Sequence, residues 1–406
     1  MDSKKKTALQ LILLFGLVSL FGDIVYEGAR SVNGQYLKTL GANAAIVGLV
    51  AGLAEFLGYA IRLASGYFSD KAKAYWLFTF IGYGMLISVP LLSLTGVWQV
   101  AVIFIIAERI GKAIRSPARD TILSQATKQV GTGLGFAVAE ALDQIGAITG
   151  PLILVVFFMF LGKGDRSLMD YQLGYSLLWI PLILVLVCLI LAYRRAPNPE
   201  VLEAQVTKKH ESDKLSRIFW VYTVFTFITT LGFANFALIG YHFKVKHILT
   251  DAQIPLFYAL AMGVDAIAAL AIGKVYDILK NRRKNENAGL LTLIAIPVFS
   301  LFIPMLVFST SFSLVLIGAI IWGIVMGFHE TVMRSAIADI TSLKKRGTGY
   351  GIFNAAYGLA VFFGSVLIGL LYEKSIGVVI IASVVVELVA IAAFFVLKKE
   401  ALTVQA

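Results

Sequence analysis

The sequence is short of cysteine, histidine and charged residues. Its single cysteine, Cys188, cannot form an internal disulfide, and it excludes a metal site built from several thiolates. Only 4 histidines are present, and no Ser-His-Asp arrangement or zinc-ligand spacing accompanies them. We therefore expect no catalytic residues, no bound metal and no cofactor. Charged residues make up 15% of the 406 residues, whereas soluble proteins average about 25%, and this shortage excludes an ordinary soluble enzyme.

Long apolar runs take the place of the missing polar residues. Hydrophobic residues account for 59% of the chain, in runs long enough to cross a bilayer as an α-helix, which takes about 20 residues. The runs lack the alternation of apolar and polar residues that marks the strands of an outer-membrane barrel. We therefore predict an all-α membrane protein with twelve transmembrane helices. Their expected positions are 8–37, 43–67, 74–94, 97–120, 132–160, 173–193, 216–243, 252–278, 288–308, 311–338, 348–371 and 375–397.

The basic residues are unevenly divided between the two sides of this topology. Most lie before the first span, after the last span, or in the connections that follow even-numbered spans. Because positively charged loops stay in the cytoplasm, we expect both termini to face the cytoplasm. The net charge of +11 then reports topology, and we expect no nucleic-acid partner. The basic residues at 4–6 precede a long apolar stretch that Asp23 interrupts, which predicts a retained first span and not a signal peptide.

Two short patterns occur twice, which predicts that the chain consists of two related halves. The pattern Gly-x-x-x-Asp stands at 66–70, leaving span 2, and again at 273–277, leaving span 8. The pattern Gly-Thr-Gly-x-Gly stands at 131–135, entering span 5, and again at 347–351, entering span 11. We expect an N-terminal six-helix bundle at 1–193, a polar cytoplasmic linker at 194–217 and a C-terminal six-helix bundle at 218–406.

With these repeats the chain resembles a transporter of the major facilitator superfamily over essentially its whole length. The stretch 66–73 is similar to that superfamily's signature loop between spans 2 and 3, although Ala72 replaces the usual glycine. Gly146, Gly150 and Pro151 in span 5 are similar to an element of the superfamily's antiporters, and we expect them to pack helices closely. The resemblance implies alternating access, in which two pseudo-symmetric six-helix bundles rock about a site near the membrane midplane.

The repeated Gly-x-x-x-Asp motif is expected to act as a gate at the cytoplasmic side. Gly66 removes a side chain where two helices approach, and Asp70 then lies within reach of basic side chains on span 4. Such a charge-assisted pair would hold one conformation and break in another. A plain helix-stop turn is the alternative interpretation. The predicted gating residues are Gly66, Asp70, Lys71, Arg115, Arg119, Gly273 and Asp277.

Ionisable residues inside the predicted spans point to the transport pathway. Each costs about 2.5–3.5 kcal/mol at the bilayer centre, so such residues normally face a cavity or a partner. The resemblance implies that spans 1, 2, 4, 5, 7, 8, 10 and 11 line that cavity. Glu387 in span 12 does not fit this pattern, and we interpret it as a packing or snorkelling residue. The predicted cavity residues are Asp23, Glu27, Arg30, Glu108, Arg109, Lys112, Glu140, Asp143, Asp265, Glu330 and Arg334.

The carboxylates of this set predict proton coupling. A carboxylate in a cavity of low dielectric constant binds a proton more readily than in water, and a nearby arginine opposes that binding. We expect Asp23 and Glu27, on one face of span 1, to carry the coupled protons. Arg30 and Arg109 would be the modulating cations. Static ion pairs that only specify packing are the alternative interpretation. The second choices for the proton site are Glu140, Asp143 and Glu108.

The resulting prediction is a secondary transporter of the cell membrane that exports a small organic compound in exchange for protons. Its expected partners are that substrate, protons and the lipid bilayer, and we expect a monomer. Uptake of a polar or anionic metabolite is the first alternative, because acids and bases are mixed in the cavity. A divalent-cation exporter using Asp23, Glu27 and His329 is the second, although clustered His, Cys and Met residues are missing. A transport-inactive sensor or scaffold is the third.

Overall fold

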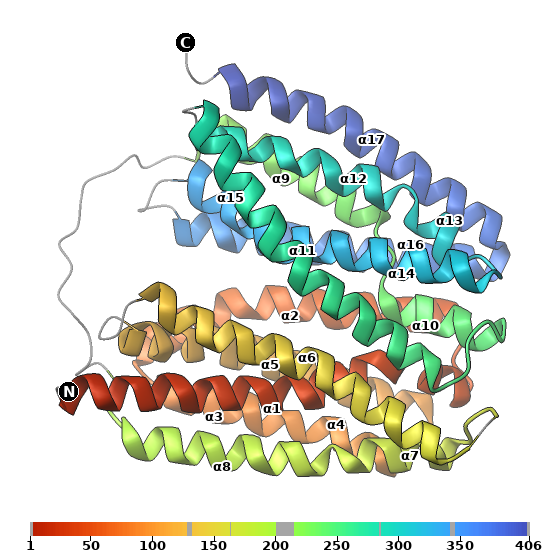
Figure 1. The fold of residues 1–406 in the computed structure, drawn as a ribbon, viewed down its shortest axis with the longest axis horizontal. Coiled ribbons are helices and arrows are strands. Elements are labelled where there is room, and N and C mark those ends of the chain that lie inside the picture. Colours follow the sequence, from red (N-terminus) through yellow and green to blue (C-terminus); the bar gives the residue numbers. More distant parts are fainter. Residues whose placement is uncertain are drawn as a thin grey trace. The chain divides into compact units, whose positions relative to one another are not determined.

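The described part of the chain consists of helices and short connections. The structure is a computed structural model, and it describes residues 3–127, 132–162, 164–199, 215–283, 286–341 and 346–403. Within these ranges no residue lies in a β-strand. The predicted all-α fold is therefore confirmed (Figure 1).

Each of the first six predicted spans corresponds to a helical segment. Spans 1, 2, 4 and 5 are the continuous helices α1 (Ser3–Thr39), α2 (Ala44–Ala72), α5 (Trp98–Thr127) and α6 (Thr132–Phe160). Span 3 comprises α3 (Tyr75–Gly84), the 3-10 turn η1 (Met85–Ile87), α4 (Ser88–Leu91) and the 3-10 turn η2 (Leu92–Leu94). Span 6 comprises α7 (Leu168–Leu177) and α8 (Trp179–Arg195).

The remaining six spans are also helical, and three of them contain irregular turns. Spans 8, 11 and 12 are α11 (Gln253–Arg283), α16 (Arg346–Lys374) and α17 (Ile376–Thr403). Span 7 comprises α9 (Arg217–Gly232) and α10 (Phe236–Val245). Span 9 comprises the 3-10 helix η4 (Glu286–Ile294), α12 (Ala295–Ser300) and α13 (Ile303–Val307). Span 10 comprises α14 (Phe312–Gly327), the π-helical turn η5 (Phe328–Val332) and α15 (Met333–Ile340).

Eleven helical segments among the described residues are long and apolar enough to cross a membrane. The predicted fourth span, α5, is the helix outside that set, because four ionisable residues interrupt its apolar half. It is nevertheless one continuous helix of 30 residues, and it packs against α1, α3 and α6. Neighbouring helices therefore accommodate charges that lipid would not. The four residues are Glu108, Arg109, Lys112 and Arg115.

The breaks within spans have local causes that the apolar runs do not mark. α7 begins at Leu168, earlier than predicted, because Ser167 and Asp170 form a capping box at its start. The helix is interrupted before Pro181, which has no N–H to donate to a carbonyl one turn earlier. Pro304 has the same effect at the start of α13. In span 7, the Asn235 side chain accepts the Ala237 N–H and so starts α10 after a short non-helical stretch.

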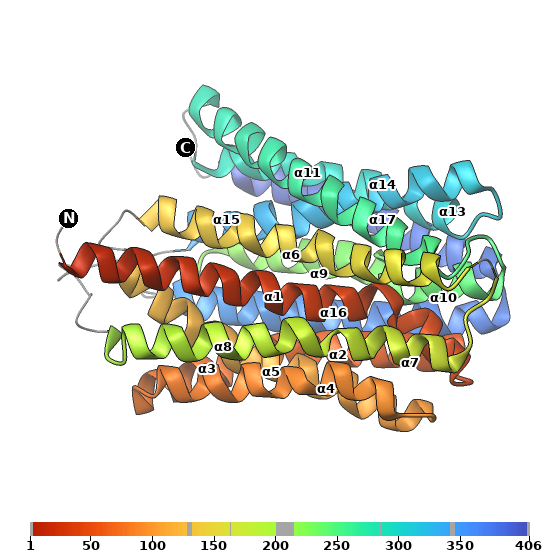
Figure 2. The ribbon, with the colours of Figure 1, turned by 60° about the horizontal axis from the view of Figure 1, so that its bottom comes forward.

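The chain forms two compact units. Unit 1 comprises Met1–Ala42, Leu57–Lys208 and Thr250–Ala259, and unit 2 comprises Asn43–Phe56, Lys209–Leu249 and Leu260–Ala406. In unit 1, α1 lies between α6 and α8, which is visible in two orientations (Figure 1, Figure 2). In unit 2, α9 packs against α16 and α17. The helix α1 thus supplies the centre of unit 1, where its ionisable residues are covered.

Glycines set the closest helix contacts in both units. A Cβ atom on Gly146 of α6 would lie 2.3 Å from the Leu20 carbonyl oxygen of α1, and one on Gly150 would lie 2.5 Å from the Ile24 oxygen. In unit 2, a Cβ atom on Gly364 of α16 would lie 2.3 Å from the carbonyl oxygen of Leu231 on α9. Span 5 therefore packs on span 1 as span 11 packs on span 7, backbone against backbone.

Candidate functional site

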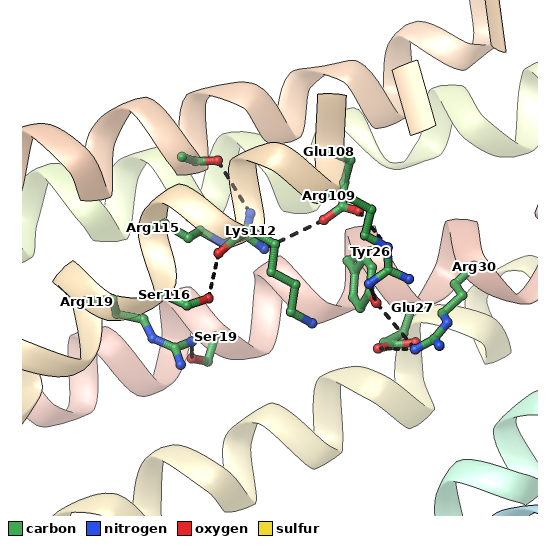
Figure 3. Close-up of polar contacts among 11 residues, drawn as sticks. Ser19, Tyr26, Glu27, Arg30, Glu108, Arg109, Lys112, Arg115, Ser116 and Arg119 are labelled. Atoms are coloured by element: carbon green, nitrogen blue, oxygen red, sulfur yellow. Dashed lines mark hydrogen bonds and ion pairs between the residues drawn. The ribbon is translucent and has the colours of Figure 1, made fainter. Parts of the chain in front are cut away.

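Ionisable residues of α1, α5 and α6 meet inside unit 1. On α1, the helical spacing places Asp23, Glu27 and Arg30 along one face. That face is covered: the exposed fraction is 9% for Asp23 and 7% for Glu27. The buried acids therefore need partners from neighbouring helices, and α5 supplies most of them (Figure 3).

Tyr26 is the centre of the contacts between α1 and α5. The guanidinium of Arg109 donates to the Tyr26 hydroxyl and lies over its ring, with 4.5 Å between the guanidinium carbon and the ring centre. Nη1 of Arg30 donates to the same hydroxyl over 3.3 Å. The ammonium of Lys112 lies 3.8 Å from the ring centre. One aromatic ring therefore receives three cations, as Figure 3 shows.

Glu27 joins this cluster through two oxygens. Oε1 lies 3.7 Å from Nη1 of Arg30, one turn along α1. Oε2 accepts a hydrogen bond from the hydroxyl of Tyr258, which is on α11 and belongs to unit 1. Tyr258 is not among the residues predicted from the sequence, and no motif marks it, because an isolated tyrosine in an apolar span is common.

Asp23 pairs with a second acid. Its side chain is near enough to that of Asp143 on α6 to interact with it electrostatically, since the close contact at Gly146 brings α6 against α1. Lys112 is near enough to interact electrostatically with both Asp23 and Glu27. Two ionised carboxylates in this position would repel each other, and a proton shared between them would remove that repulsion.

Glu108 and Arg115 of α5 are paired with each other and with neighbouring groups. Glu108 lies 3.7 Å from Nε of Arg109 and 3.9 Å from Nη2 of Arg115. Arg115 is buried; it donates to the Gly82 carbonyl of α3 over 3.4 Å and lies 4.7 Å from the Tyr83 ring centre. The glycines of both helices allow this approach, since a Cβ atom on Gly82 would lie 2.4 Å from Cβ of Arg115.

The structure describes most residues of the predicted gate at span 2, but not the side chain of Asp70. A Cβ atom on Gly66 would lie 3.5 Å from Pro117 of α5, so α2 and α5 are close there. The Lys71 ammonium lies 5.8 Å from the Tyr67 ring centre. Arg119 pairs with Asp120 over 2.8 Å and donates to the Ser19 hydroxyl over 3.2 Å. The side chain of Asp70 lies outside the described residues, so its pairing with Arg115 or Arg119 stays a prediction.

The second copy of the motif, in unit 2, shows a different acid. Asp277 is exposed, whereas Asp339 of α15 accepts from Lys280 over 2.9 Å and from the Tyr276 hydroxyl over 2.7 Å. A Cβ atom on Gly273 would lie 3.5 Å from Thr331. Asp339 is not among the residues predicted from the sequence, although a repeat marks it: Arg-Ser-x-x-x-Asp occurs at 115–120 and again at 334–339.

The other predicted cavity residues have different surroundings. Glu140 of α6 is exposed, and Asp265 of α11 is buried in unit 2. Glu330 lies in the π-helical turn η5, next to His329, whose Nδ1 is 3.0 Å from the Tyr357 hydroxyl. The side chain of Arg334 lies outside the described residues. Seven predicted residues are therefore brought together in unit 1: Asp23, Glu27, Arg30, Glu108, Arg109, Lys112 and Asp143.

Over the ranges that the structure describes, no three His, Cys, Asp or Glu side chains are placed to hold a metal ion together. The unit 1 cluster presents carboxyl, ammonium, guanidinium and phenol groups. These groups can bind and pass protons and can pair with polar or charged parts of a small molecule.

Sequence comparison finds relatives along the whole chain. A family profile described as Major Facilitator Superfamily matches residues 12–305 and 288–405. An uncharacterized protein of Mycobacterium tuberculosis, Rv2265, is 37% identical over 398 residues, which cover 97% of this chain and 94% of the relative. An uncharacterized MFS-type transporter of Methanocaldococcus jannaschii, MJ1317, is 25% identical over 368 residues, which cover 90% of this chain and 89% of the relative.

Solved structures share the fold at low sequence identity. A bacterial homolog of the human lysosomal transporter Spinster has a TM-score of 0.71 at 14% identity, covering 99% of this chain and 98% of its own. The nucleoside transporter NupG has a TM-score of 0.67 at 13% identity, covering 96% and 99%. PepTSo2 has a TM-score of 0.71 at 11% identity, covering 97% and 98%.

Proposed function

Because the chain belongs to the Major Facilitator Superfamily, we propose that it exports a small organic compound by alternating access, in exchange for protons. The family and its structural neighbours make the chain a multi-pass transporter of the cell membrane and not an enzyme. The proposal adds the coupling ion, the direction and the kind of cargo. It also includes two bundles, 1–193 and 218–406, that rock about the site with both termini in the cytoplasm.

The acid pair Asp23–Asp143 is the observation that carries proton coupling. The two carboxyl groups come from different helices and interact electrostatically, and in this proposal they share one proton. If α1 and α6 shift, the pair separates and the shared proton loses one of its two acceptors. A proton site built across a helix contact in this way responds to conformation, which coupling requires. Asp143 thereby changes from a second choice to a partner of Asp23.

Lys112 supplies the opposing charge. Its ammonium rests on the Tyr26 ring, and it interacts electrostatically with Asp23 and Glu27. When that ammonium moves from the ring toward Asp23, it stabilises the ionised carboxylate and favours proton release. We therefore assign the modulating role to Lys112 together with Arg30 and Arg109. A carboxylate or other polar part of the cargo would compete for the same ammonium and couple cargo to proton.

Export is proposed from the similarity of Gly146, Gly150 and Pro151 to the antiporter element. The structure supports a link to coupling, because a Cβ atom on Gly146 would lie 3.1 Å from Cβ of Asp23. The antiporter-like element thus packs directly beside the acid pair. Uptake of a polar or anionic metabolite is the second candidate, and the three cations around Tyr26 favour it.

A transport assay tests the proposal in two steps. A thermal-shift screen of nucleosides, peptides, organic anions, amphiphilic cations and divalent metals first finds a stabilising compound. That compound is then added to proteoliposomes that contain a pH-sensitive dye. Export in exchange for protons predicts proton movement opposite to the compound, whereas uptake with protons predicts movement in the same direction. Stabilisation by a metal alone would instead indicate a cation exporter, and transport by no compound a sensor or scaffold.

Variants locate the coupling site. Asp23→Asn and Asp143→Asn should each lower proton movement at least tenfold while counterflow of the compound continues. Glu140→Gln tests the competing second choice on the same helix, because Glu140 lies on α6 within one turn of Asp143 and is exposed. Loss of proton movement in this variant alone would move the proton site to Glu140. A double variant of Asp23→Asn and Glu27→Gln that still couples fully would disprove proton coupling at this cluster.

A further inference from the structure

Glu387 of α17 is a buried acid that the proposed mechanism does not use. Its exposed fraction is 0%, whereas Leu388 and Val389 beside it are 53% and 51% exposed. α17 therefore turns Leu388 and Val389 outward and the carboxyl group of Glu387 inward, so the snorkelling interpretation of Glu387 is wrong. A buried carboxyl group needs a specific environment, and that environment indicates its charge.

The two oxygens of Glu387 face the end of α9. Oε2 accepts a hydrogen bond from the Thr229 hydroxyl over 2.9 Å. Oε1 has no hydrogen-bond partner among the residues that the structure describes. A Cβ atom on Gly232 would lie 2.5 Å from Oε1, so this oxygen lies against the last residue of α9. The C-terminal end of a helix carries partial negative charge, which disfavours a carboxylate there.

No basic side chain compensates for a charge on Glu387 in the described segments around it. α12 and α13 contain no ionisable residue, and neither does the middle of α16, 358–371. On α9 the ionisable residues are Arg217, which pairs with Glu400, and Tyr222, which donates to the Met333 carbonyl. On α16, Tyr357 bonds to His329. On α17 itself, Lys398 and Lys399 lie about three turns away, and the side chain of Glu286 in η4 lies outside the described residues.

We propose that Glu387 is a second proton-binding site of this transporter, held as a neutral acid by its contact with the end of α9. Burying a carboxylate that has one hydroxyl donor and no cation would cost several kcal/mol of folding free energy. The neutral acid still accepts the hydrogen bond from Thr229 and carries no charge that needs compensation. The site is separate from the Asp23–Asp143 pair and does not depend on the function proposed for that pair.

The position of Glu387 connects its proton to the break in span 7. α9 ends at Gly232, and the non-helical residues Phe233, Ala234 and Asn235 follow. Phe233 stacks on Trp322, with ring centres 5.6 Å apart, and its ring lies tilted against that of His329, with ring centres 4.9 Å apart. The break therefore contacts span 10 at its π-helical turn. When α9 and α10 change their relative angle, the surroundings of Oε1 change, and the proton is bound or released with that motion.

Infrared difference spectroscopy of the purified full-length protein tests the charge directly. A pH step applied to the wild type should show a carboxylic-acid C=O band that Glu387→Gln removes. Thr229→Val should shift this band without removing it, because the acid then loses its hydroxyl donor. Glu373→Gln is the matched control: Glu373 is exposed on α16, so the band should persist. Asp23→Asn should also leave it, which separates this site from the acid pair.

Thermal stability provides the second measurement. The folded protein keeps a proton on Glu387 that the unfolded chain releases at neutral pH, so raising the pH favours unfolding of the wild type. Between about pH 5 and pH 9 the wild-type Tm should therefore fall relative to that of Glu387→Gln, with the variant at least as stable at neutral pH. A retained band in Glu387→Gln, or a variant less stable than wild type at every pH, would show that Glu387 is ionised and structural.

Discussion

The ammonium of Lys112 on α5 lies 3.8 Å from the centre of the Tyr26 ring on α1. A lysine in this position is held by an aromatic face and not by a carboxylate, although Asp23 and Glu27 are near enough to attract it. The attraction to a ring is weaker than an ion pair in a dry site, so the ammonium is held close to the acids without neutralising them permanently. This arrangement suits a cation that must change partners during transport.

Replacement of Tyr26 separates the two roles of its side chain. Tyr26→Phe keeps the ring beneath Lys112 but removes the hydroxyl that accepts from Arg30 and Arg109. Tyr26→Leu removes both. We expect the leucine variant to lose about 1–2 kcal/mol more stability than the phenylalanine variant, because a partly desolvated cation–π contact is lost. Thermal unfolding in detergent measures this difference, and equal losses in the two variants would contradict a role for the ring.

The contact between α6 and α1 predicts a strong effect of a single methyl group. Gly146→Ala would place a Cβ atom 2.3 Å from the Leu20 oxygen, so the helices must separate, at a cost of about 1–3 kcal/mol. Gly58→Ala in α2 is the matched control, since no atom lies within 4 Å of its added Cβ, and there alanine should be neutral or stabilising by up to about 1 kcal/mol. Similar melting temperatures for both variants would show that α1 and α6 are not held this closely.

Asp277 of α11 and Asp339 of α15 offer a comparison of two acids near the second copy of the motif. Asp339→Asn weakens contacts to Lys280 and Tyr276, and both ion-pair partners are 19% exposed. We expect a loss of about 1 kcal/mol, because solvent screens part of the interaction. Asp277→Asn changes an exposed residue and should leave stability unchanged. If transport slows only in the Asp277 variant, the gate predicted from the sequence motif is correct and Asp339 is structural.

A buried acid in the loop before α11 predicts a measurable coupling. Oδ2 of Asp251 accepts a hydrogen bond from the backbone N–H of Arg166 over 2.6 Å, and Oδ1 accepts one from the Tyr171 hydroxyl over 2.7 Å. Asp251→Ala should cost about 1–3 kcal/mol, because it leaves buried donors unsatisfied. The double variant with Tyr171→Phe should cost less than the sum of the single changes. Additive losses would mean that the two side chains do not depend on each other.

The twelve spans were predictable because apolar runs of membrane length have few alternative structures. The charged fourth span was also predictable, since Glu108, Lys112 and Arg115 recur on one face of a helix. The breaks in spans 6, 7, 9 and 10 were not predictable from the runs, because an interrupted helix is as apolar as a continuous one. Prolines mark two of these breaks, but the π-helical turn η5 has no sequence signal that we recognise.

The candidate site was predictable to the level of helices and faces. Spacing along α1 gave Asp23, Glu27 and Arg30, but partners on other helices depend on which faces meet, and a single sequence does not determine that. Tyr258 was therefore missed, and Asp143 ranked below Glu27. Asp339 was missed for a different reason, because its Arg-Ser-x-x-x-Asp repeat contains only three fixed residues.

The charges of α5 also bear on how the chain enters the membrane. Four ionisable residues in its apolar half would each oppose partition into lipid by about 2.5–3.5 kcal/mol, so hydrophobicity alone does not commit this helix to the bilayer. Its partners Tyr26, Gly82 and Tyr83 belong to helices that the ribosome completes earlier. We therefore expect α5 to be inserted as the companion of α1 and α3. The order in which the ribosome completes the helices then contributes to the insertion of α5 into the membrane.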